Sequence, residues 1–408
     1  MRSSYKPLGN YIEQVKTRNV GGHFNELRGV SIEKLFMSSV ANIHGVDLSK
    51  YKVVKTGQFA FNPMHVGRDK VLPISLLASK EPVIVSPAYA VFRISDENLL
   101  PEYLMMWCSR SEFDRNAWFK TDGNVRGGLS WDDFCEITLP VPDLSEQQRI
   151  VSEYKAVTNR IRLNKHLIKR LEDTAQAIHK QWFTDFEFPM SLKYAESIGK
   201  PEIAGRPYKA SGGEMRYDDQ IRKDVPMQWD VIVLDDIAEI KAGGDKPKSF
   251  SSTKSGKYVI PIYSNGLVND GLYGYTEKPV IEKRSITISA RGSIGFSALR
   301  SLPFVPIVRL LVLTPNNPLL VGYLYQWAKT YDFADSGSVQ SQLTIPQISN
   351  IAVLVPANEI LAKYEEVTAA TISFVESIKQ ENEKLKDLGN VVLARMSLLS
   401  LEKVEALV

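Results

Sequence analysis

Two long stretches of the chain place apolar residues at alternating spacings of four and three. The first follows Pro142 and the second follows Pro356, and each has one asparagine on its apolar stripe, Asn164 and Asn382. This heptad spacing predicts two long α-helices, over residues 144–184 and 357–408, that pack on each other as a coiled coil. The first stripe comprises Ile150, Tyr154, Val157, Ile161, Asn164, Ile168, Leu171, Ala175, Ile178 and Trp182, and the second comprises Leu361, Tyr364, Thr368, Thr371, Val375, Ile378, Asn382, Leu385, Gly389, Val392, Met396 and Leu399.

Both stretches open in the same way, as LPVPDLSEQQRIVSEY (139–154) and VLVPANEILAKYEEV (353–367). A short apolar run ends at a proline and turns into a charged helical segment. In the first stretch, Ser145 and Gln148 have the spacing of a capping box. A buried helix of an ordinary bundle is the alternative explanation of such a stripe, but the length and the duplication favour two helices packed on each other.

The direction of the two helices fixes their register. The first leads from one domain to the next, so the second returns antiparallel, and the residue numbers of facing partners add to a constant. Placing Asn164 opposite Asn382 sets this constant at 546. We predict that this buried asparagine pair sets the register at some cost in stability. The other expected pairs are Val157 with Gly389, Ile161 with Leu385, Ile168 with Ile378, Leu171 with Val375, and Trp182 with Tyr364.

The segments before the helices also repeat. VRGGLSWDDFCEITLPVP (125–142) aligns with VQSQLTIPQISNIAVLVP (339–356) at an offset of 214 residues, and YLMMWCSRSEF (103–113) resembles YLYQWAKTYDF (323–333). Each copy mixes β-rich stretches with one helix. We therefore expect an α+β protein with two tandem globular domains, 1–143 and 217–356, that are related by a pseudo-two-fold and separated by the antiparallel helices. The Pro-, Gly- and Ser-rich segment 185–216 is expected to be an irregular linker.

Composition adds little to this picture. The net charge of +3 at pH 7 is too balanced to indicate nucleic acid by itself, and the two cysteines, Cys108 and Cys135, form no disulfide framework. A reduced, cytoplasmic setting is expected. The N-terminus lacks a signal peptide's apolar run, and the longest apolar run, LPFVPIVRLLVLTP, is interrupted by prolines and Arg309, so no membrane association is expected.

The order of features resembles a known family. SEQQRIV leads into KQWFTDFEFP, then GRPYKASGGEM and VPMQWDVIVLDDIAEIKAGG. Over essentially the whole chain this is similar to the DNA-specificity (S) subunit of type I restriction–modification enzymes, with two target recognition domains and two spacer helices. The first domain lacks the proline–tryptophan opening of VPMQW, so the two domains are expected to read different half-sites.

The resemblance implies a non-catalytic protein without its own cofactor. It implies binding to double-stranded DNA at an asymmetric, bipartite, gapped site. It also implies two adenine methyltransferase (M) subunits and motor/nuclease (R) subunits as partners, with S-adenosylmethionine, ATP and Mg²⁺ used by those partners. The methyltransferase contacts are expected on the outer faces of the two helices.

Candidate DNA-binding residues are polar or basic and lie in loops between β-segments. Lysines suit phosphate contacts, asparagine can read adenine, and arginine is the commonest reader of guanine. Each of these residues, taken alone, is also typical of a solvated surface or a turn. The candidates are Lys16, Arg18, Asn62, His65, Arg68 and Arg126 in the first domain, and Lys241, Lys246, Lys248, Ser264, Asn265, Arg291, Ser293, Gln340 and Gln342 in the second.

Two other classes of function are open. Pro142-Asp143 followed by Glu153-x-Lys155 resembles a metal-dependent nuclease signature, but two positions apart on a helix Glu153 and Lys155 do not face each other. The five histidines show no metal-ligand spacing, and His166 and His179 are expected on the outer faces of the helix. The remaining alternative is a scaffold whose domains bind protein. Salt-dependent, sequence-selective DNA binding separates the DNA-recognition function from this scaffold.

Overall fold

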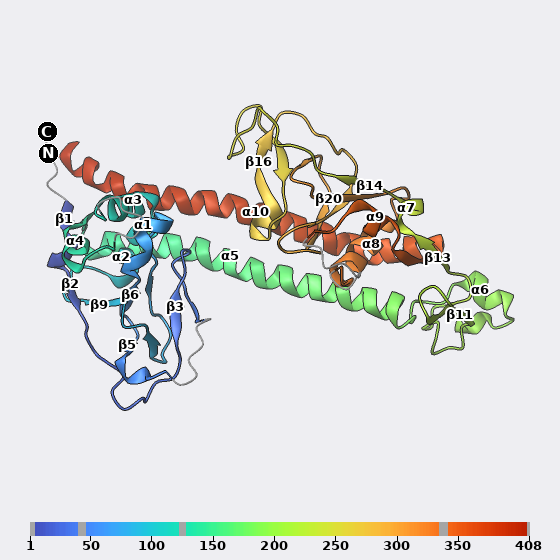
Figure 1. The fold of residues 1–408 in the computed structure, drawn as a ribbon, viewed down its shortest axis with the longest axis horizontal. Helices are drawn as coiled ribbons and strands as arrows, with labels where there is room; N and C mark the ends of the chain where they lie inside the picture. Colours follow the sequence, from blue (N-terminus) through green and yellow to red (C-terminus); the bar gives the residue numbers. More distant parts are fainter. Residues whose placement is uncertain (1–4, 40–45, 122–127, 334–341, 406–408) are drawn as a thin grey trace. The chain divides into compact units, whose positions relative to one another are not determined.

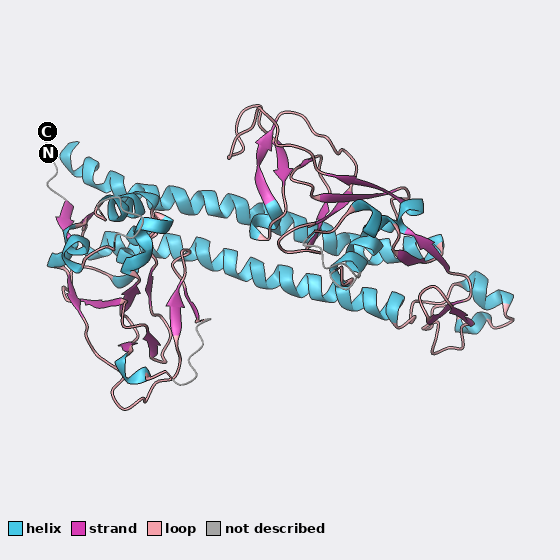
Figure 2. Cartoon of the chain, viewed as in Figure 1, coloured by secondary structure: helices cyan, strands magenta, loops and turns pink. Residues whose placement is uncertain are grey.

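The computed structural model of the chain describes residues 5–39, 46–121, 128–333 and 342–405, with the side chains of His65 and of residues 398–405 left out. The chain forms two compact units (Figure 1). Unit one comprises Met1–Lys165 and Gln380–Val408, and unit two comprises His166–Lys379. Each unit therefore holds one globular domain together with part of each long helix. Helices and strands are mixed in both domains, which makes the fold α+β (Figure 2).

The two long helices are α5 (Leu144–His179), which continues as a π-helical turn over Lys180–Thr184, and α10 (Asn358–Glu405). The heptad positions are buried or half-buried wherever their side chains are described. Leu399 lies outside the described side chains. The predicted capping box at Ser145 is wrong: the Asp143 carboxylate accepts the Glu146 N–H at 3.0 Å and caps the helix one residue before its start.

The helices are antiparallel and form a coiled coil within each unit. In unit one, the Asn164 side chain donates to Asn382 Oδ1 at 2.9 Å, and a Cβ built on Gly389 would lie 3.7 Å from Val157 Cγ1. In unit two, the ring centroids of Trp182 and Tyr364 are 5.7 Å apart. The residue numbers of each of these pairs add to 546, the constant expected from the heptads.

The first domain is built on a four-stranded antiparallel sheet of order β2-β9-β6-β7, while β1 pairs with β10, β3 with β4, and β5 with β8. Its strands are β1 (Tyr5–Pro7), β2 (Ile12–Gln14), β3 (Arg28–Val30), β4 (Phe36–Ser38), β5 (Lys52–Val54), β6 (Phe59–Phe61), β7 (Ile74–Leu76), β8 (Val83–Val85), β9 (Ala90–Ile94) and β10 (Thr138–Pro140). Its helices are α1 (Val66–Asp69), α2 (Pro101–Cys108), α3 (Ser111–Phe119) and α4 (Trp131–Glu136).

The second domain repeats this plan. Its main sheet has the order β14-β20-β17-β18, and β13 pairs with β21 as β1 does with β10. Its strands are β13 (Asp230–Val233), β14 (Ala238–Ala242), β15 (Ile260–Tyr263), β16 (Leu272–Thr276), β17 (Ser285–Ile288), β18 (Ser297–Arg300), β19 (Val305–Pro306), β20 (Leu311–Pro315) and β21 (Ala352–Val355), and its helices are α7 (Leu234–Ile237), α8 (Leu320–Thr330) and α9 (Ile345–Ser349). The hairpin β11 (Met215–Asp218) and β12 (Lys223–Pro226) precedes it.

Equivalent hydrogen bonds mark the duplication at atomic level. The Tyr103 hydroxyl on α2 donates to the Pro140 carbonyl, and the Tyr323 hydroxyl on α8 donates to the Leu354 carbonyl. The two carbonyls are 214 residues apart, the offset of the sequence repeat. The N-cap residues of α4 and α9 have the same offset and are both hydroxyl side chains, Ser130 and Thr344. The repeat therefore preserves contacts as well as the order of elements.

The hydrophobic cores join each domain to the helix pair. In unit one, Ile150 of α5 and Met396 of α10 belong to the core of the first domain. In unit two, Phe183 and Tyr364 belong to the core of the second. Burial of such side chains is the main stabilising term in a fold of this size. Among the helices of the described chain, none combines the length and apolar content that a membrane crossing requires.

The segment 185–216, which was expected to be an irregular linker, is packed against the second domain. It contains little regular structure, namely α6 (Leu192–Ser197), a short 3-10 turn and the first residues of β11, but it packs into the core of the second unit. Phe188 stacks on Trp229 with ring centroids 4.8 Å apart and on Tyr208 at 4.6 Å. Phe186, Phe188 and Tyr208 are buried in the core of the second unit. Pro, Gly and Ser residues break the helix and strand pattern here while aromatic residues hold the segment in place.

Candidate nucleic-acid interface

In the second domain, several loops leave one end of the four-stranded sheet. Ala242 at the end of β14 pairs with Leu311 at the start of β20, and Leu311 pairs with Ile288 at the end of β17. Ile288 in turn pairs with Ser297 at the start of β18. The loops after β14, between β17 and β18, and before β20 therefore emerge together. These loops carry the candidates Lys246, Lys248, Arg291 and Ser293.

Asn265 holds these loops to one another. Its Nδ2 donates to the Val308 carbonyl and its Oδ1 accepts the Ala290 N–H, both at 2.7 Å. Predicted as a candidate reader of adenine, Asn265 thus has its amide engaged by two other loops of its own domain. This arrangement assigns it a positioning role at the sheet end. Ser264, beside it, donates its backbone N–H to the Gly271 carbonyl at 2.8 Å.

Two candidates from distant loops meet at this sheet end. The exposed Arg291 donates from Nε to the side-chain oxygen of Gln342 at 2.9 Å, and from Nη2 to the same oxygen. One end of the guanidinium is thereby oriented. Gln342 precedes α9, where the Leu343 N–H binds the Ala290 carbonyl at 2.9 Å. This backbone hydrogen bond joins the residues next to Arg291 and Gln342, and so holds the two side chains near each other.

The lysine candidates of the second domain are all exposed. Lys241, on β14, forms an ion pair with Glu239 at 2.7 Å. The Lys246 ammonium lies 4.1 Å from the ring centroid of Phe250 and 5.8 Å from that of Tyr273. Exposed lysines place their ammonium groups in solvent, where a DNA phosphate can reach them. Gln340 lies outside the described residues.

The first domain has the same arrangement. Gln14 at the end of β2 pairs with Phe92 of β9, and Phe61 at the end of β6 pairs with Ala90 at the start of β9. Residues 15–20 and 62–73 therefore leave one end of the sheet. They carry Lys16, Arg18, Asn62, His65 and Arg68. Arg126 lies outside the described residues, but the nearby Leu129 N–H binds the Pro63 carbonyl at 3.1 Å, as Leu343 binds Ala290 in the second domain.

Lys52 joins this basic group, although no motif or spacing singled it out among the lysines of the chain. Arg18 forms a β-bridge with Lys52, whose Nζ donates to the Tyr89 carbonyl at 2.5 Å. Partial burial lowers the pKa of Lys52, and the positive charges of Arg18 and Lys16 lower it further. Lys52 is therefore bridged to Arg18 and lies within electrostatic reach of Lys16. Three cations of like sign are suited to an anionic partner.

The remaining candidates of the first domain have local partners. Asn62 Oδ1 accepts the Met64 N–H at 3.1 Å and caps a 3-10 turn. Arg68 is exposed and forms an ion pair with Asp69 at 2.7 Å. Of His65 only the backbone, in that turn, is described. Asn62 therefore shapes its loop through its oxygen, as Asn265 does in the second domain.

The residues of the nuclease-like signature serve the helix instead. Asp143 is the cap of α5, Glu153 pairs with Arg149 at 2.5 Å, and Lys155 pairs with Glu102 at 3.0 Å. Within the described part of the chain, no group of three or more His, Cys, Asp or Glu side chains is placed to hold a metal ion. The signature residues are thus engaged in structural contacts with other residues.

His179 is not on an outer face, contrary to expectation, whereas His166 is exposed. The His179 ring stacks on Tyr323 of α8 with centroids 5.4 Å apart and also contacts Phe183 and Tyr364. Desolvation lowers the pKa of His179 to about 4, against a raising effect of its hydrogen bond to the Tyr323 backbone. The second domain packs on this side of α5, which the heptad stripe alone does not reveal.

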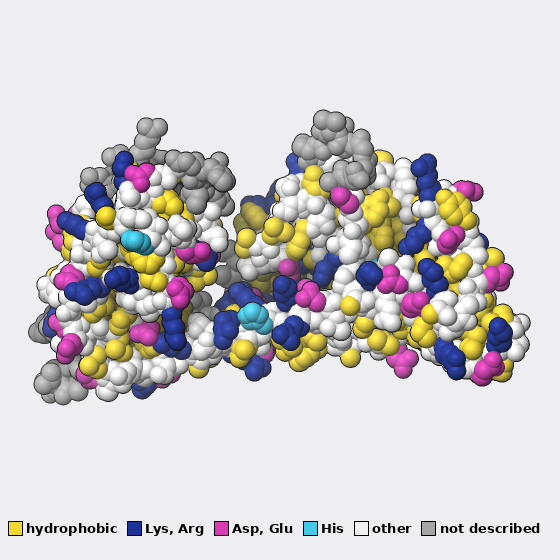
Figure 3. Space-filling view, turned by 90° about the horizontal axis from the view of Figure 1, so that it is seen from below, with side chains coloured by type: hydrophobic (Ala, Val, Ile, Leu, Met, Phe, Trp, Pro, Cys, Tyr) yellow, Lys and Arg dark blue, Asp and Glu magenta, His cyan; other side chains and the backbone are white. Residues whose placement is uncertain are grey.

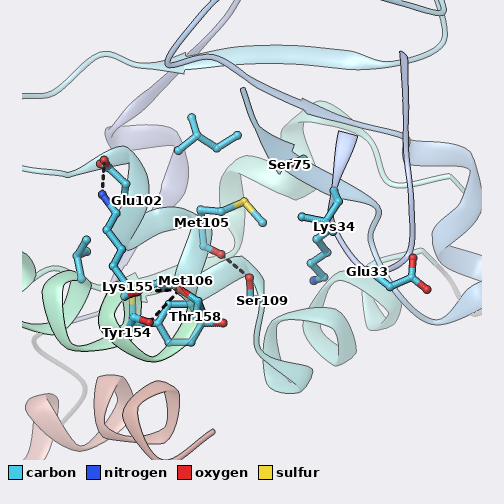
Figure 4. Close-up of a pocket in the computed structure, with 13 residues that line it drawn as sticks. Glu33, Lys34, Ser75, Glu102, Met105, Met106, Ser109, Tyr154, Lys155 and Thr158 are labelled. Carbon is cyan, nitrogen blue, oxygen red and sulfur yellow. Dashed lines mark hydrogen bonds and ion pairs between the residues drawn. The ribbon is translucent and has the colours of Figure 1, made fainter. Parts of the chain in front are cut away.

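A cavity of about 360 Å³ lies in unit one. It is lined by the β3–β4 turn, β7, α2 and α5, and Figure 4 shows the Glu102–Lys155 pair on one side of it and Lys34 on the other. None of the candidate DNA-binding residues that the structure describes lines it. Lys34 is buried and forms an ion pair with Asp114 at 2.7 Å, which ties the β3–β4 turn to α3.

One face of the molecule carries charges of both signs. On the face seen in Figure 3, Lys and Arg side chains are interspersed with Asp and Glu over both domains. No broad field of one sign covers the described residues of this face.

Comparisons with known proteins are consistent with this arrangement. The model of the type I restriction modification DNA specificity domain matches residues 74–173 and 226–388, more than half of the chain. The HindI specificity subunit of Haemophilus influenzae is 23% identical over an alignment of 419 residues, covering 89% of this chain and 90% of that protein. A putative type I specificity subunit of Mycoplasma pneumoniae is 34% identical over 143 residues, 35% of this chain and 39% of that protein.

Among solved structures, the crystal structure of a type I restriction–modification S subunit from M. genitalium shares the fold. Its TM-score is 0.52 at 15% sequence identity, with 96% of this chain and 95% of that chain covered. The chain belongs to the type I restriction modification DNA specificity family, the non-catalytic DNA-recognition subunits of type I restriction–modification systems.

Proposed function

We propose that each domain reads one half of an asymmetric, bipartite DNA site through the loops at one end of its four-stranded sheet. One observation carries the proposal: in both copies of the duplicated domain, loops rich in candidate residues leave the equivalent end of the sheet, β2-β9-β6-β7 in one and β14-β20-β17-β18 in the other. Related proteins differ in sequence more in such loops than in the strands that the loops connect, so the sheet keeps its geometry. Two different loop sets on one scaffold then give two different half-sites.

The contacts divide by chemistry. Exposed lysines such as Lys246 and Lys248 neutralise phosphates and set the overall affinity. Arg291, with part of its guanidinium held by Gln342, reads a base edge, because an oriented arginine loses less conformational freedom on binding. Asn265 and Asn62 hold the loops in shape. Specificity is then a sum over both domains, separated by a gap that neither reads.

The partners are two adenine methyltransferase subunits, with motor/nuclease subunits joining for cleavage. Family membership supports this part of the proposal. S-adenosylmethionine, ATP and Mg²⁺ would be used by those partners. A methyltransferase that flips its target adenine out of the duplex needs only to be placed over it, which is the task of this chain.

Genome-wide mapping of methylated adenine in the source cell, with and without the gene, tests the proposal. We expect one bipartite motif with an unread gap to lose methylation in the deletion strain, and to regain it when the gene is restored. If no motif changes and the purified chain shows no salt-dependent, sequence-selective binding to duplex DNA, the DNA-recognition proposal is wrong and a protein-binding scaffold is favoured.

A further inference from the structure

Val308 and Arg309 have an unusual backbone. Both adopt left-handed φ angles, +53° and +58°, in succession. A left-handed conformation is costly for a side chain with a Cβ, and most of all for a β-branched residue such as valine. Val308 is also 51% exposed, so burial of its side chain does not offset this cost. A strained and exposed pair persists only where the surrounding structure enforces it, and such pairs are concentrated at functional sites.

Two other loops enforce this turn. The Val308 carbonyl accepts from Asn265 Nδ2 at 2.7 Å. The N–H groups of Val308 and Arg309 donate to the carbonyls of Gly244 and Gly243, both at 2.9 Å. A side chain at Gly243 would place its Cβ 2.7 Å from the Ile307 nitrogen, so only glycine permits this approach. These three hydrogen bonds together hold the backbone of the Val308–Arg309 turn in its conformation.

The turn presents Arg309 at the candidate interface. Arg309 stands just before β20, at the sheet end from which the Gly243–Gly244 and Ala290–Arg291 loops also emerge. Its side chain is exposed, and its guanidinium has no hydrogen-bond or ion-pair partner among the described residues. Other arginines of this domain are engaged: Arg300 is buried over the Tyr263 ring, and Arg284 pairs with Glu365.

We propose that the Val308–Arg309 turn is a base-reading element of the second domain, in which Arg309 donates to a guanine of the half-site that this domain recognises. The inference rests on the proposed DNA-recognition function and deepens it. Guanine offers two acceptors in the major groove, N7 and O6, which match the paired donors of a guanidinium. Asn265 and Gly243 act through the turn and are positioning residues. A turn fixed before DNA arrives avoids the entropy cost of ordering the arginine's backbone on binding.

The test uses the full chain and duplexes carrying the motif found by methylation mapping, each with one base pair of the second domain's half-site replaced. Arg309→Ala is expected to weaken binding to the intact site by about 10- to 100-fold. It should abolish discrimination at one G·C pair and leave the first domain's half-site unchanged. Lys283→Ala is the matched control, because Lys283 is exposed just before β17, at the opposite end of the same sheet. It should leave discrimination intact.

Asn265→Ala tests the positioning role. It should reduce discrimination at the same base pair as Arg309→Ala, and the double variant should lose no more than Arg309→Ala alone, since both act through one contact. If Asn265→Ala fails to fold, the exposed Arg309 variant still decides the question. Uniform weakening across all duplexes, with a smaller salt dependence, would reassign Arg309 to a phosphate and overturn the inference, as would unchanged discrimination. If the wild-type chain does not discriminate among the duplexes, the DNA-recognition function is wrong and this inference is wrong with it.

Discussion

Asn164 on α5 and Asn382 on α10 face each other across the helix pair, joined by a 2.9 Å hydrogen bond between their buried side chains. The Asn164 amide also donates to Glu381, which forms an ion pair with Arg160 at 3.0 Å. Shifting the register by one heptad would place Asn164 opposite Val375 or Gly389, neither of which offers a side-chain hydrogen bond. Asn382 would then face Val157 or Leu171. The pair therefore selects one register at the expense of the burial that two leucines would provide.

Replacing both asparagines by leucine is expected to raise the midpoint of thermal unfolding. Removing both partners of a buried hydrogen bond leaves no polar group unsatisfied. Asn164→Leu alone leaves the buried Asn382 side chain without this partner and should lower the free energy of unfolding by about 1–3 kcal/mol. Thermal unfolding of the double and the two single variants measures both effects. A large loss of stability in the double variant would show that the pair contributes more than register.

Gly389 offers a second test of the helix pairing. It lies in the interior of α10, and a Cβ there would make ordinary contacts of 3.7 Å with Val157 and Tyr154. Gly389→Ala should therefore stabilise unit one by about 1 kcal/mol through helix propensity alone. Gly389→Leu should destabilise it by about 1–3 kcal/mol, because the extra atoms overfill the interface. Chemical denaturation separates the two outcomes, and equal effects would contradict the pairing of Gly389 with Val157.

The buried His179 should make the free energy of unfolding depend on pH. Its pKa in the folded protein is about 4, against 6.5 when exposed, and its Nε2 is buried without a hydrogen-bond partner among the described residues. Below pH 6.5 the unfolded chain binds the proton more tightly than the folded chain. The free energy of unfolding therefore falls as pH drops from 6.5 towards 4. At pH 5 the loss from this group is about 2 kcal/mol.

His179→Phe should remove that part of the pH dependence, since a phenyl ring preserves the contacts with Phe183 and Tyr323. Unfolding of variant and wild type at pH 7 and pH 5 gives the comparison. His166→Gln, an exposed position on the same helix, serves as the control and should follow the wild type. A parallel decline in His179→Phe and wild type would exclude His179 as the source.

A structural feature could be predicted from the sequence where the residues that form it are regularly spaced along the chain. It could not be predicted where the contacts join residues that are far apart in the chain. The heptad repeats at fixed spacing and the Asn164–Asn382 pair selects its register, so the pairing of Val157 with Gly389 could be predicted from the sequence. The role of Asn265 could not, because its partners Val308 and Ala290 lie 43 and 25 residues away. His179 is buried by α8, an element outside the heptad. Arg309 stands alone inside an apolar run, and only the sheet topology shows that it ends a loop at the candidate interface.

Domain exchange tests whether the two halves of the site are read separately. Residues 217–356 contain β13–β21 and their own sheet-end loops, so a relative's segment grafted between the same boundaries replaces one set of loops and leaves the first domain's sheet intact. The segment 185–216 must be kept compatible, because Phe188, which stacks on Tyr208, also stacks on Trp229 of the exchanged part. Adenine methylation mapping in cells carrying the chimaera should show one new half-site beside one unchanged half-site, at the same gap. If both halves change, the domains do not read DNA independently, and the loops of one must depend on contacts supplied by the other.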